Sequence, residues 1–166
     1  MTTIVATTRA LYADSQCTSF PGFKTSKLAY VQCKKSGEDY LVGGAGYLEE
    51  LHFMVKLIGE YGLEQIWALH LGEHWPPKIM KNADTDLLVV TRQKKIYMFN
   101  AGLVPMPINQ NTYAIGSGGE YATSALAFGK TATEAVEFAC EHDPYSKGPV
   151  HELTFPRRKK DAVHGD

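Results

Sequence analysis

The chain has 166 residues, of which 44% are hydrophobic and 21% charged, and its formal net charge is −1 at pH 7. This length fits one domain with a full core and is short for two. The near-neutral charge excludes a global basic field that would hold nucleic acid or an anionic membrane. No apolar run approaches the length of a membrane span. We therefore expect a soluble, cytoplasmic protein, with residues 1–155 as one domain and residues 156–166 as a basic, flexible C-terminal tail.

The cysteines are odd in number, widely spaced and lack a CxxC pair: Cys17, Cys33 and Cys140. Such spacing is typical of reduced thiols that pack as small hydrophobic side chains. A disulfide framework or a cysteine metal site is therefore not expected.

The first 45 residues have the composition of β-structure. Alternating and β-branched residues, separated by turn-forming segments such as KKSG, predict strands in residues 2–9, 10–14, 27–33 and 38–44. From Leu48 the apolar period changes to i, i+3, i+4, i+7, and residues 48–62 are predicted to form an amphipathic helix that ends near Gly62. Its apolar face is formed by Leu51, Met54, Val55, Ile58 and Tyr61.

A second helix is predicted for residues 63–74, because Pro76 and Pro77 follow it directly. Residues 86–100 then predict two strands around a polar turn, and residues 111–116 a further strand before a glycine-rich segment. Helices are expected over 120–128 and 133–142, the latter opened by a Thr131–Glu134 capping box, and residues 150–155 give a last strand. Helix pairs between blocks of strands indicate an α+β fold with antiparallel sheets and helices outside them.

One pattern points to a metal. His70, Glu73 and His74 match HxxEH, which would set two imidazoles one helical turn apart with a glutamate between them. Gly72 lowers the helix propensity inside the pattern, and no recognisable third ligand follows. A zinc metallopeptidase at these residues is the minor alternative.

The start of the chain suggests a different chemistry. Initiator Met is generally removed before a residue as small as Thr, so the mature chain could begin at Thr2 with a free α-amine. That amine, with an unperturbed pKa near ~7.8, can take the proton of the threonine hydroxyl. Such a nucleophile needs a cation nearby, a carboxylate to hold the cation, and backbone N–H groups for an oxyanion.

Six ordered segments carry a family resemblance: TTIV at 2–5, Asp14-Ser15, Lys27 before LAYV, GGAG at 43–46, AIGSGG at 114–119 and DPYS at 143–146. In order and rough spacing they resemble the proteasome β-subunit family of N-terminal nucleophile threonine peptidases. The start and the AIGSGG segment are most similar to the bacterial HslV peptidases. The resemblance implies a four-layer αββα sandwich of antiparallel sheets, the N-terminal nucleophile hydrolase fold.

The resemblance also implies a role for each matching residue. Thr2 would be the nucleophile, Lys27 the cation, Asp14 its carboxylate partner, and the Gly46 N–H the oxyanion donor. Ser117 would lie near the nucleophile's amine, with Asp143 and Ser146 as a supporting pair. Ordinary structural roles remain open for these residues: Asp14 in a turn, Lys27 as a surface charge, Ser117 in a glycine turn and Asp143 at a helix end.

The sequence departs from the family in three places. The first hairpin is short, so that Asp14 can face Lys27 only across a compact turn. The Asp-x-x-Ser at 143–146 is a proteasome feature in an otherwise HslV-like chain. Gly44 leaves no side chain where the family often lines the pocket for the residue before the scissile bond.

The implied activity is cleavage of peptide bonds in unfolded or short polypeptides inside a homo-oligomeric ring, with an HslU-type AAA+ unfoldase as a candidate partner. No cofactor is expected to be required, although a structural monovalent or divalent cation is left open. Phe53, Leu57, Leu63, Trp67 and Trp75 lie off the apolar face of their helices and are expected to be exposed, as in an assembling subunit. If Met1 is retained, the alternative is a catalytically silent subunit that serves assembly or binding.

Overall fold

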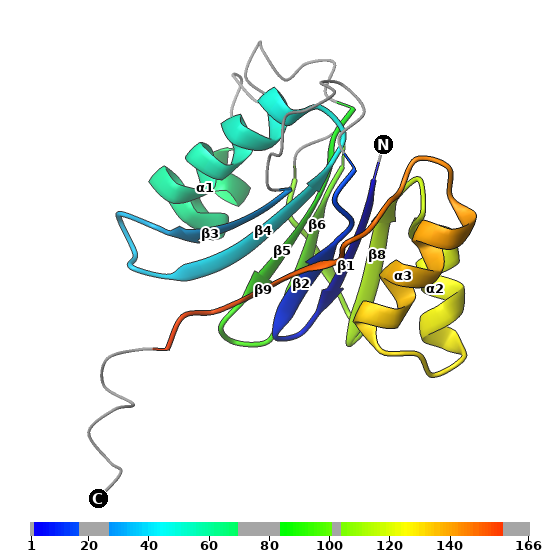
Figure 1. Cartoon of the computed structure of the whole chain (residues 1–166). Helices are drawn as coiled ribbons and strands as arrows, with labels where there is room; N and C mark the ends of the chain where they lie inside the picture. The colour runs from blue at the N-terminus through cyan, green and yellow to red at the C-terminus, as the bar shows by residue number, and fades with distance from the viewer. Residues whose placement is uncertain (1, 17–26, 70–83, 101–103, 158–166) are drawn as a thin grey trace, which may run out of the picture.

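The computed structural model describes residues 2–16, 27–69, 84–100 and 104–157. Two antiparallel sheets form its centre (Figure 1). The first has the strand order β8-β1-β2-β9 and the second the order β3-β4-β5-β6-β7. The strands are β1 Thr3–Thr7, β2 Ala10–Ala13, β3 Leu28–Gln32, β4 Asp39–Ala45, β5 Asp86–Thr91, β6 Ile96–Phe99, β7 Met106–Ile108, β8 Thr112–Gly116 and β9 His151–Thr154.

Helices cover the outer face of each sheet, which gives the expected α+β sandwich of four layers (Figure 1). Helix α1 (Leu48–Leu69) packs on the second sheet, and helices α2 (Gly119–Ala127) and α3 (Ala132–His142) pack on the first. The predicted capping box of α3 is confirmed, because Thr131 Oγ1 accepts the Glu134 N–H and the Glu134 carboxylate accepts the Thr131 N–H.

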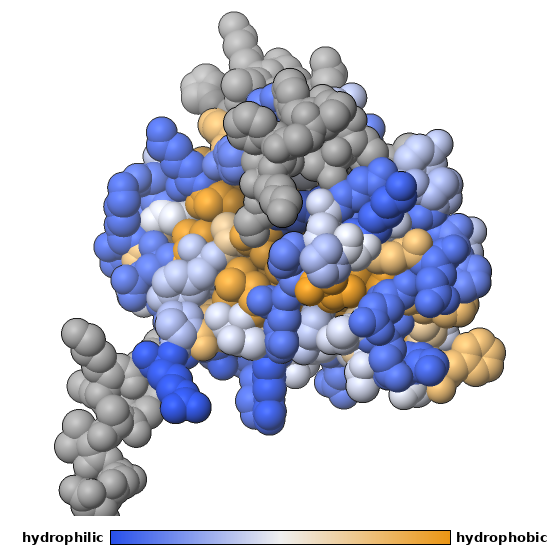
Figure 2. All heavy atoms as spheres, in the orientation of Figure 1, coloured by the Kyte–Doolittle hydropathy of each residue, from blue (hydrophilic) through white to orange (hydrophobic). Residues whose placement is uncertain are grey.

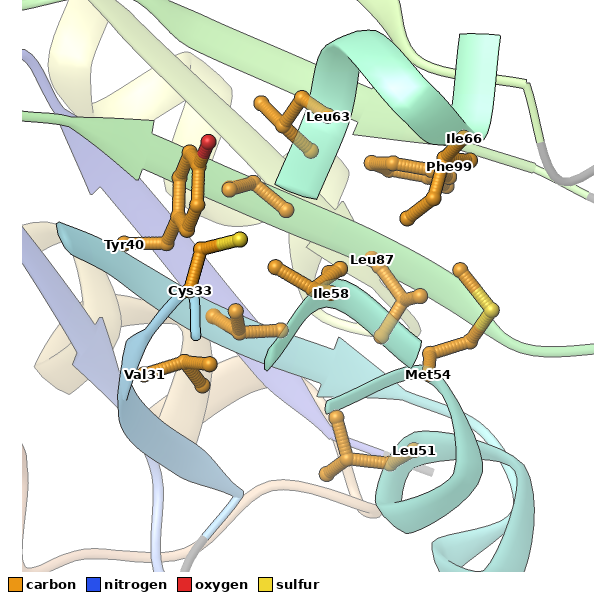
Figure 3. Packing of buried hydrophobic residues seen from close by; sticks show 12 residues of the cluster. Val31, Cys33, Tyr40, Leu51, Met54, Ile58, Leu63, Ile66, Leu87 and Phe99 are labelled. Carbon is orange, nitrogen blue, oxygen red and sulfur yellow. The ribbon is translucent and has the colours of Figure 1, made fainter. Parts of the chain in front are cut away.

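The core is divided among the layers. Between the sheets, large aliphatic side chains such as Ile4, Leu11, Leu41 and Leu88 are fully buried. Under α1, Figure 3 shows Met54, Ile58 and Leu87 packed together with aromatic and other apolar neighbours. The layer under α2 and α3 is built mainly of alanines around Val5, and these small side chains let both helices approach β1 closely.

Helix α1 covers the first predicted helix and the second as far as Leu69, with a kink at Gly62 between them, and residues 70–74 lie outside the described residues. Gly62 has φ 72° and ψ 171°, a conformation that other residues rarely adopt. The kink turns Leu63, predicted to be exposed, into the core, where it is 7% exposed. Phe53 and Leu57 also pack partly buried against this core, so those expectations were wrong, whereas Trp67 is 48% exposed. Tyr61, predicted to lie on the apolar face, is 37% exposed.

Strand β7 was not predicted. It is a short strand at the edge of the second sheet and contains Pro107, which sequence rules count against a strand. An edge strand can tolerate the missing N–H, since one side of it has no neighbour. None of the helices in the described ranges combines the length and hydropathy that crossing a bilayer would require.

Candidate active site

Thr2, Asp14 and Lys27 lie together at one end of the sandwich. The Thr2 hydroxyl donates to Asp14 Oδ1 and accepts from the Lys27 ammonium. Lys27 Nζ also lies 2.7 Å from Asp14 Oδ1. The side chains are nearly removed from solvent, with Lys27 12% and Asp14 0% exposed. The threonine hydroxyl is thus in contact with both members of a buried ion pair.

The β1–β2 hairpin positions Asp14. Its register pairs Ile4 with Ala13, so that Asp14 comes opposite Thr3. The Asp14 N–H donates to the Thr3 carbonyl at 3.2 Å, and the Thr3 N–H donates back to Asp14 Oδ1 at 2.9 Å. Lys27 is held from the second sheet, where its carbonyl accepts the Gly44 N–H at 3.1 Å. Each sheet therefore contributes one charge to the site.

The second carboxylate oxygen of Asp14 is held by backbone groups. Asp14 Oδ2 accepts the N–H of Gln16 at 3.0 Å and that of Lys147 at 3.2 Å. A buried carboxylate is tolerated when hydrogen bonds and a cation compensate for the lost hydration. Both oxygens of Asp14 are occupied in this way, which fixes the side chain that orients Lys27.

A second polar network lies behind the first and involves Thr3, Ser117, Asp143 and Ser146. Asp143 Oδ2 accepts the hydroxyls of Ser146 at 2.6 Å and Ser117 at 2.7 Å. The Ser146 and Thr3 hydroxyls are 2.7 Å apart, and the Ser117 hydroxyl lies 3.4 Å from the Thr2 carbonyl oxygen. The network thus contacts the Thr2 carbonyl and the Thr3 side chain at the start of β1.

Hydrogen bonding sets the charge state of Asp143. Burial alone would raise the pKa of this carboxyl, but the hydroxyls of Ser146 and Ser117 and the Tyr145 N–H hold the pKa below its ordinary value of 3.8. Asp143 is therefore ionised at neutral pH and acts only as an acceptor. Gly118 makes the close packing possible, because a Cβ there would clash with the Thr3 hydroxyl and lie 3.1 Å from Ser146 Oγ.

Gly46 lies where the end of β4 approaches the start of β5. Its φ is 144°, and a Cβ there would come within 2.6 Å of Thr85 Cα and 2.8 Å of the Asp84 carbonyl oxygen. Only glycine fits this position. The Gly44 N–H points to the Lys27 carbonyl. Successive N–H groups of a strand alternate in direction, so N–H groups two residues apart point the same way. The Gly46 N–H is therefore expected on the same side as Lys27. Gly46 is exposed, and one residue, Tyr47, separates it from the start of helix α1.

Gly44 does not open a pocket in this structure. A Cβ at Gly44 would lie 2.7 Å from Leu51 Cδ1 and 3.0 Å from Leu87 Cδ2, so α1 fills the space above it. The missing side chain is explained by the packing of α1 on β4.

Sequence reasoning missed several residues that shape the site. Thr3 joins the second network through its hydroxyl. The sequence shows two adjacent threonines but does not indicate which of them contacts this network. Gln16 and Lys147 contribute backbone N–H groups, which have no signature in the side-chain sequence. Cys140 lies close enough for the Asp14 charge to affect it: burial first, and then that charge, raise the pKa of its thiol to about 11.

The alternative metal site, His70, Glu73 and His74, lies outside the described residues. Within the described ranges, no group of His, Cys, Asp and Glu side chains could hold a metal ion. Cys33 and Cys140 are free thiols, and Cys17 falls outside the described part.

Neither the protein-family models nor the curated protein sequences gave a match to this chain. Solved structures gave many. Thiobacillus denitrificans BPH in complex with epoxomicin is 19% identical, with a TM-score of 0.63 over 93% of this chain and 97% of that one. Eukaryotic HslV from Trypanosoma brucei is 18% identical, with a TM-score of 0.63 over 92% and 99%. Anbu, an ancestral β-subunit from Yersinia bercovieri, is 16% identical, with a TM-score of 0.68 over 93% and 81%. The resemblance is therefore confirmed in the fold: the chain shares the layered arrangement of antiparallel sheets and helices of these proteins.

Proposed function

We propose that this protein is a threonine peptidase that uses Thr2 as its nucleophile once the peptide bond before Thr2 has been cleaved. The observation that carries the proposal is the contact of the Thr2 hydroxyl with both Lys27 and Asp14. A threonine that served only as a surface residue of a strand would need neither a cation nor a carboxylate at its hydroxyl. A buried cation beside it favours the alkoxide, which is the reactive form.

In the proposed reaction, Thr2 Oγ1 attacks the carbonyl carbon of the substrate while its proton passes to the freed α-amine. The Gly46 N–H stabilises the oxyanion, and the protonated amine then gives its proton to the leaving amine. The product of this step is an ester on Thr2. Water, deprotonated by the same amine, attacks the ester carbonyl and the bond to Thr2 Oγ1 breaks. The protonated amine returns its proton to Thr2 Oγ1, and the acid is released. Ser117 and the ionised Asp143 would orient the amine from behind.

We propose further that copies of the chain form a closed ring, with polypeptide substrates reaching the sites from inside. Exposed apolar side chains support an assembly: Phe128 is 90%, Tyr47 59% and Trp67 48% exposed. Figure 2 shows hydrophobic residues in the middle of one face, framed by hydrophilic ones. An HslU-type unfoldase is the candidate partner, and stimulation of casein degradation by such an ATPase would test it. Light scattering tests the ring, since a species near 18.4 kDa would contradict it.

Intact mass spectrometry and peptide hydrolysis together test the activity. The expected result is a chain that begins at Thr2, hydrolyses fluorogenic peptides and forms a one-to-one adduct with a peptide boronate. Epoxomicin, bound by the Thiobacillus protein, is a second probe. A chain that keeps Met1 and is inactive would support the silent subunit instead. Inhibition by a zinc chelator, with no adduct at Thr2, would support the metallopeptidase.

A further inference from the structure

We propose that Thr85 and Glu50 are positioning residues that hold the Gly46 N–H in the direction needed for an oxyanion. This inference rests on the proposed function, which assigns that N–H to the reaction. Both residues lie outside the segments that carry the family resemblance, and their hydrogen bonds are made to Tyr47, to Asp84 and to each other.

Thr85 directly precedes β5 and is 1% exposed. Its Oγ1 accepts the N–H of Tyr47 at 2.9 Å and donates its proton to the Glu50 carboxylate. Glu50 lies in the first turn of α1, and its carboxylate also accepts the Asp84 N–H at 3.2 Å. One hydroxyl thus connects the turn after β4 to the start of α1 and the start of β5.

Glu50 is needed because it sets the direction in which the Thr85 hydroxyl donates its hydrogen bond. A hydroxyl has one proton, and an ionised carboxylate can only accept. Thr85 therefore donates its hydroxyl hydrogen bond to the Glu50 carboxylate, and a lone pair of Oγ1 is left to accept the Tyr47 N–H. Without the carboxylate, the hydroxyl could turn its proton to the Tyr47 carbonyl, which lies 3.5 Å away.

This arrangement matters because a glycine such as Gly46 has a wider range of backbone conformations than residues with a side chain. The β4–β5 ladder fixes the backbone before it, with Ala45 paired to Asp86. The Thr85–Tyr47 hydrogen bond fixes the peptide unit after it. With both neighbouring peptide units held, the unit that carries the Gly46 N–H has little freedom to rotate. Catalysis by an oxyanion donor depends on such preorganisation, since a donor that must reorient stabilises the transition state less.

The experiment compares Thr85→Val with Thr85→Ser in the full chain that begins at Thr2. Valine preserves the shape but removes both hydrogen bonds, and kcat for a fluorogenic peptide is expected to fall about 10- to 100-fold with KM within about twofold. Serine keeps the hydroxyl and should restore kcat to within about threefold of the parent. Hydrogen exchange of the Tyr47 amide should become faster in Thr85→Val and stay slow in Thr85→Ser.

Thr91→Val is the matched control. Thr91 is the last residue of β5, at the opposite end of the strand from Thr85, and is 6% exposed. Its Oγ1 accepts the Lys95 N–H at 3.3 Å. Its kcat should match the parent. Equal kcat in Thr85→Val and the parent, or equal losses in both valine variants, would overturn the positioning role and leave the proposed function intact. A parent chain that starts at Thr2 but neither hydrolyses peptide nor binds boronate would overturn the proposed function and this inference with it.

Discussion

The polar groups around Thr2 form two networks of different physical character. The front network is an ion pair, Lys27 and Asp14, in direct contact with the Thr2 hydroxyl. The rear network has one carboxylate, Asp143, surrounded by neutral hydroxyls and a backbone N–H. Removing Lys27 or Asp14 from the front network leaves an uncompensated charge, whereas removing the Asp143 carboxylate from the rear network leaves hydroxyls that can find other acceptors. The front should therefore control reactivity, and the rear mainly the placement of the chain's first residues.

The largest effect is expected from Thr2→Ala. Loss of the nucleophile should lower the rate of peptide hydrolysis by several orders of magnitude, while the Lys27–Asp14 ion pair remains and limits the loss of stability. Rates with a fluorogenic peptide and a denaturant titration measure both quantities. Thr2→Ser, which keeps a hydroxyl, is the matched control and should retain part of the activity. Hydrolysis at the parent rate by Thr2→Ala would show that the nucleophile lies elsewhere.

Lys27→Met should affect both activity and stability. The variant leaves the buried Asp14 carboxylate with hydrogen bonds but without its cation, and the free energy of unfolding should fall by about 3–5 kcal/mol. The hydrolysis rate should fall about 1,000-fold or more, because nothing then lowers the proton affinity of the Thr2 hydroxyl. In the double variant with Asp14→Asn, stability should recover in part but activity should not. Recovery of both would place Lys27 in the fold alone.

Features of the fold that depend on local interactions could be predicted from the sequence, whereas features that depend on long-range contacts could not. The helix from Leu48 and the capping box at Thr131 are local, and both were recognised from spacing. The fold class followed from the order of the elements. The break at Gly62 is also expected from the sequence, but the burial of Leu63 depends on tertiary packing in the cluster that contains Tyr40 and Cys33, which the sequence does not reveal.

The candidate site shows the same division. Thr2, Asp14 and Lys27 could be named through the family resemblance of the segments that contain them, and the structure brings their side chains into contact. Their roles in catalysis remain predictions. Thr85 gave no signal, because its importance comes from contacts with Gly46 and Tyr47 across 38 residues of chain. Long-range contacts made by a common residue type have no motif.

Asp143→Asn tests how much the rear network contributes to stability, compared with the Lys27–Asp14 ion pair. The folded-state pKa of Asp143 lies below its ordinary value of 3.8, so its ionised form stabilises the fold above that pH, and this contribution is lost as pH falls through the folded pKa. At pH 7 the variant should lose about 1–3 kcal/mol of unfolding free energy. The difference from the parent should narrow as pH falls below 3.8. Urea titrations at pH 7 and in acid measure this, and a constant difference would contradict it.

The smallest effect is expected at Cys140, which lies near both networks but belongs to neither. Burial, followed by the charge of Asp14, raises the pKa of its thiol to about 11, so very little thiolate exists at pH 7.5. Since the thiolate is the reactive form, iodoacetamide should label Cys140 far more slowly than a free cysteine, as peptide mass mapping would show. Cys140→Ser should keep the hydrolysis rate within about twofold, because no step of the proposed reaction uses the thiol. Rapid labelling of Cys140 would contradict the raised pKa of its thiol, and a large loss of hydrolysis in Cys140→Ser would show that the thiol takes part in the reaction or in holding the site.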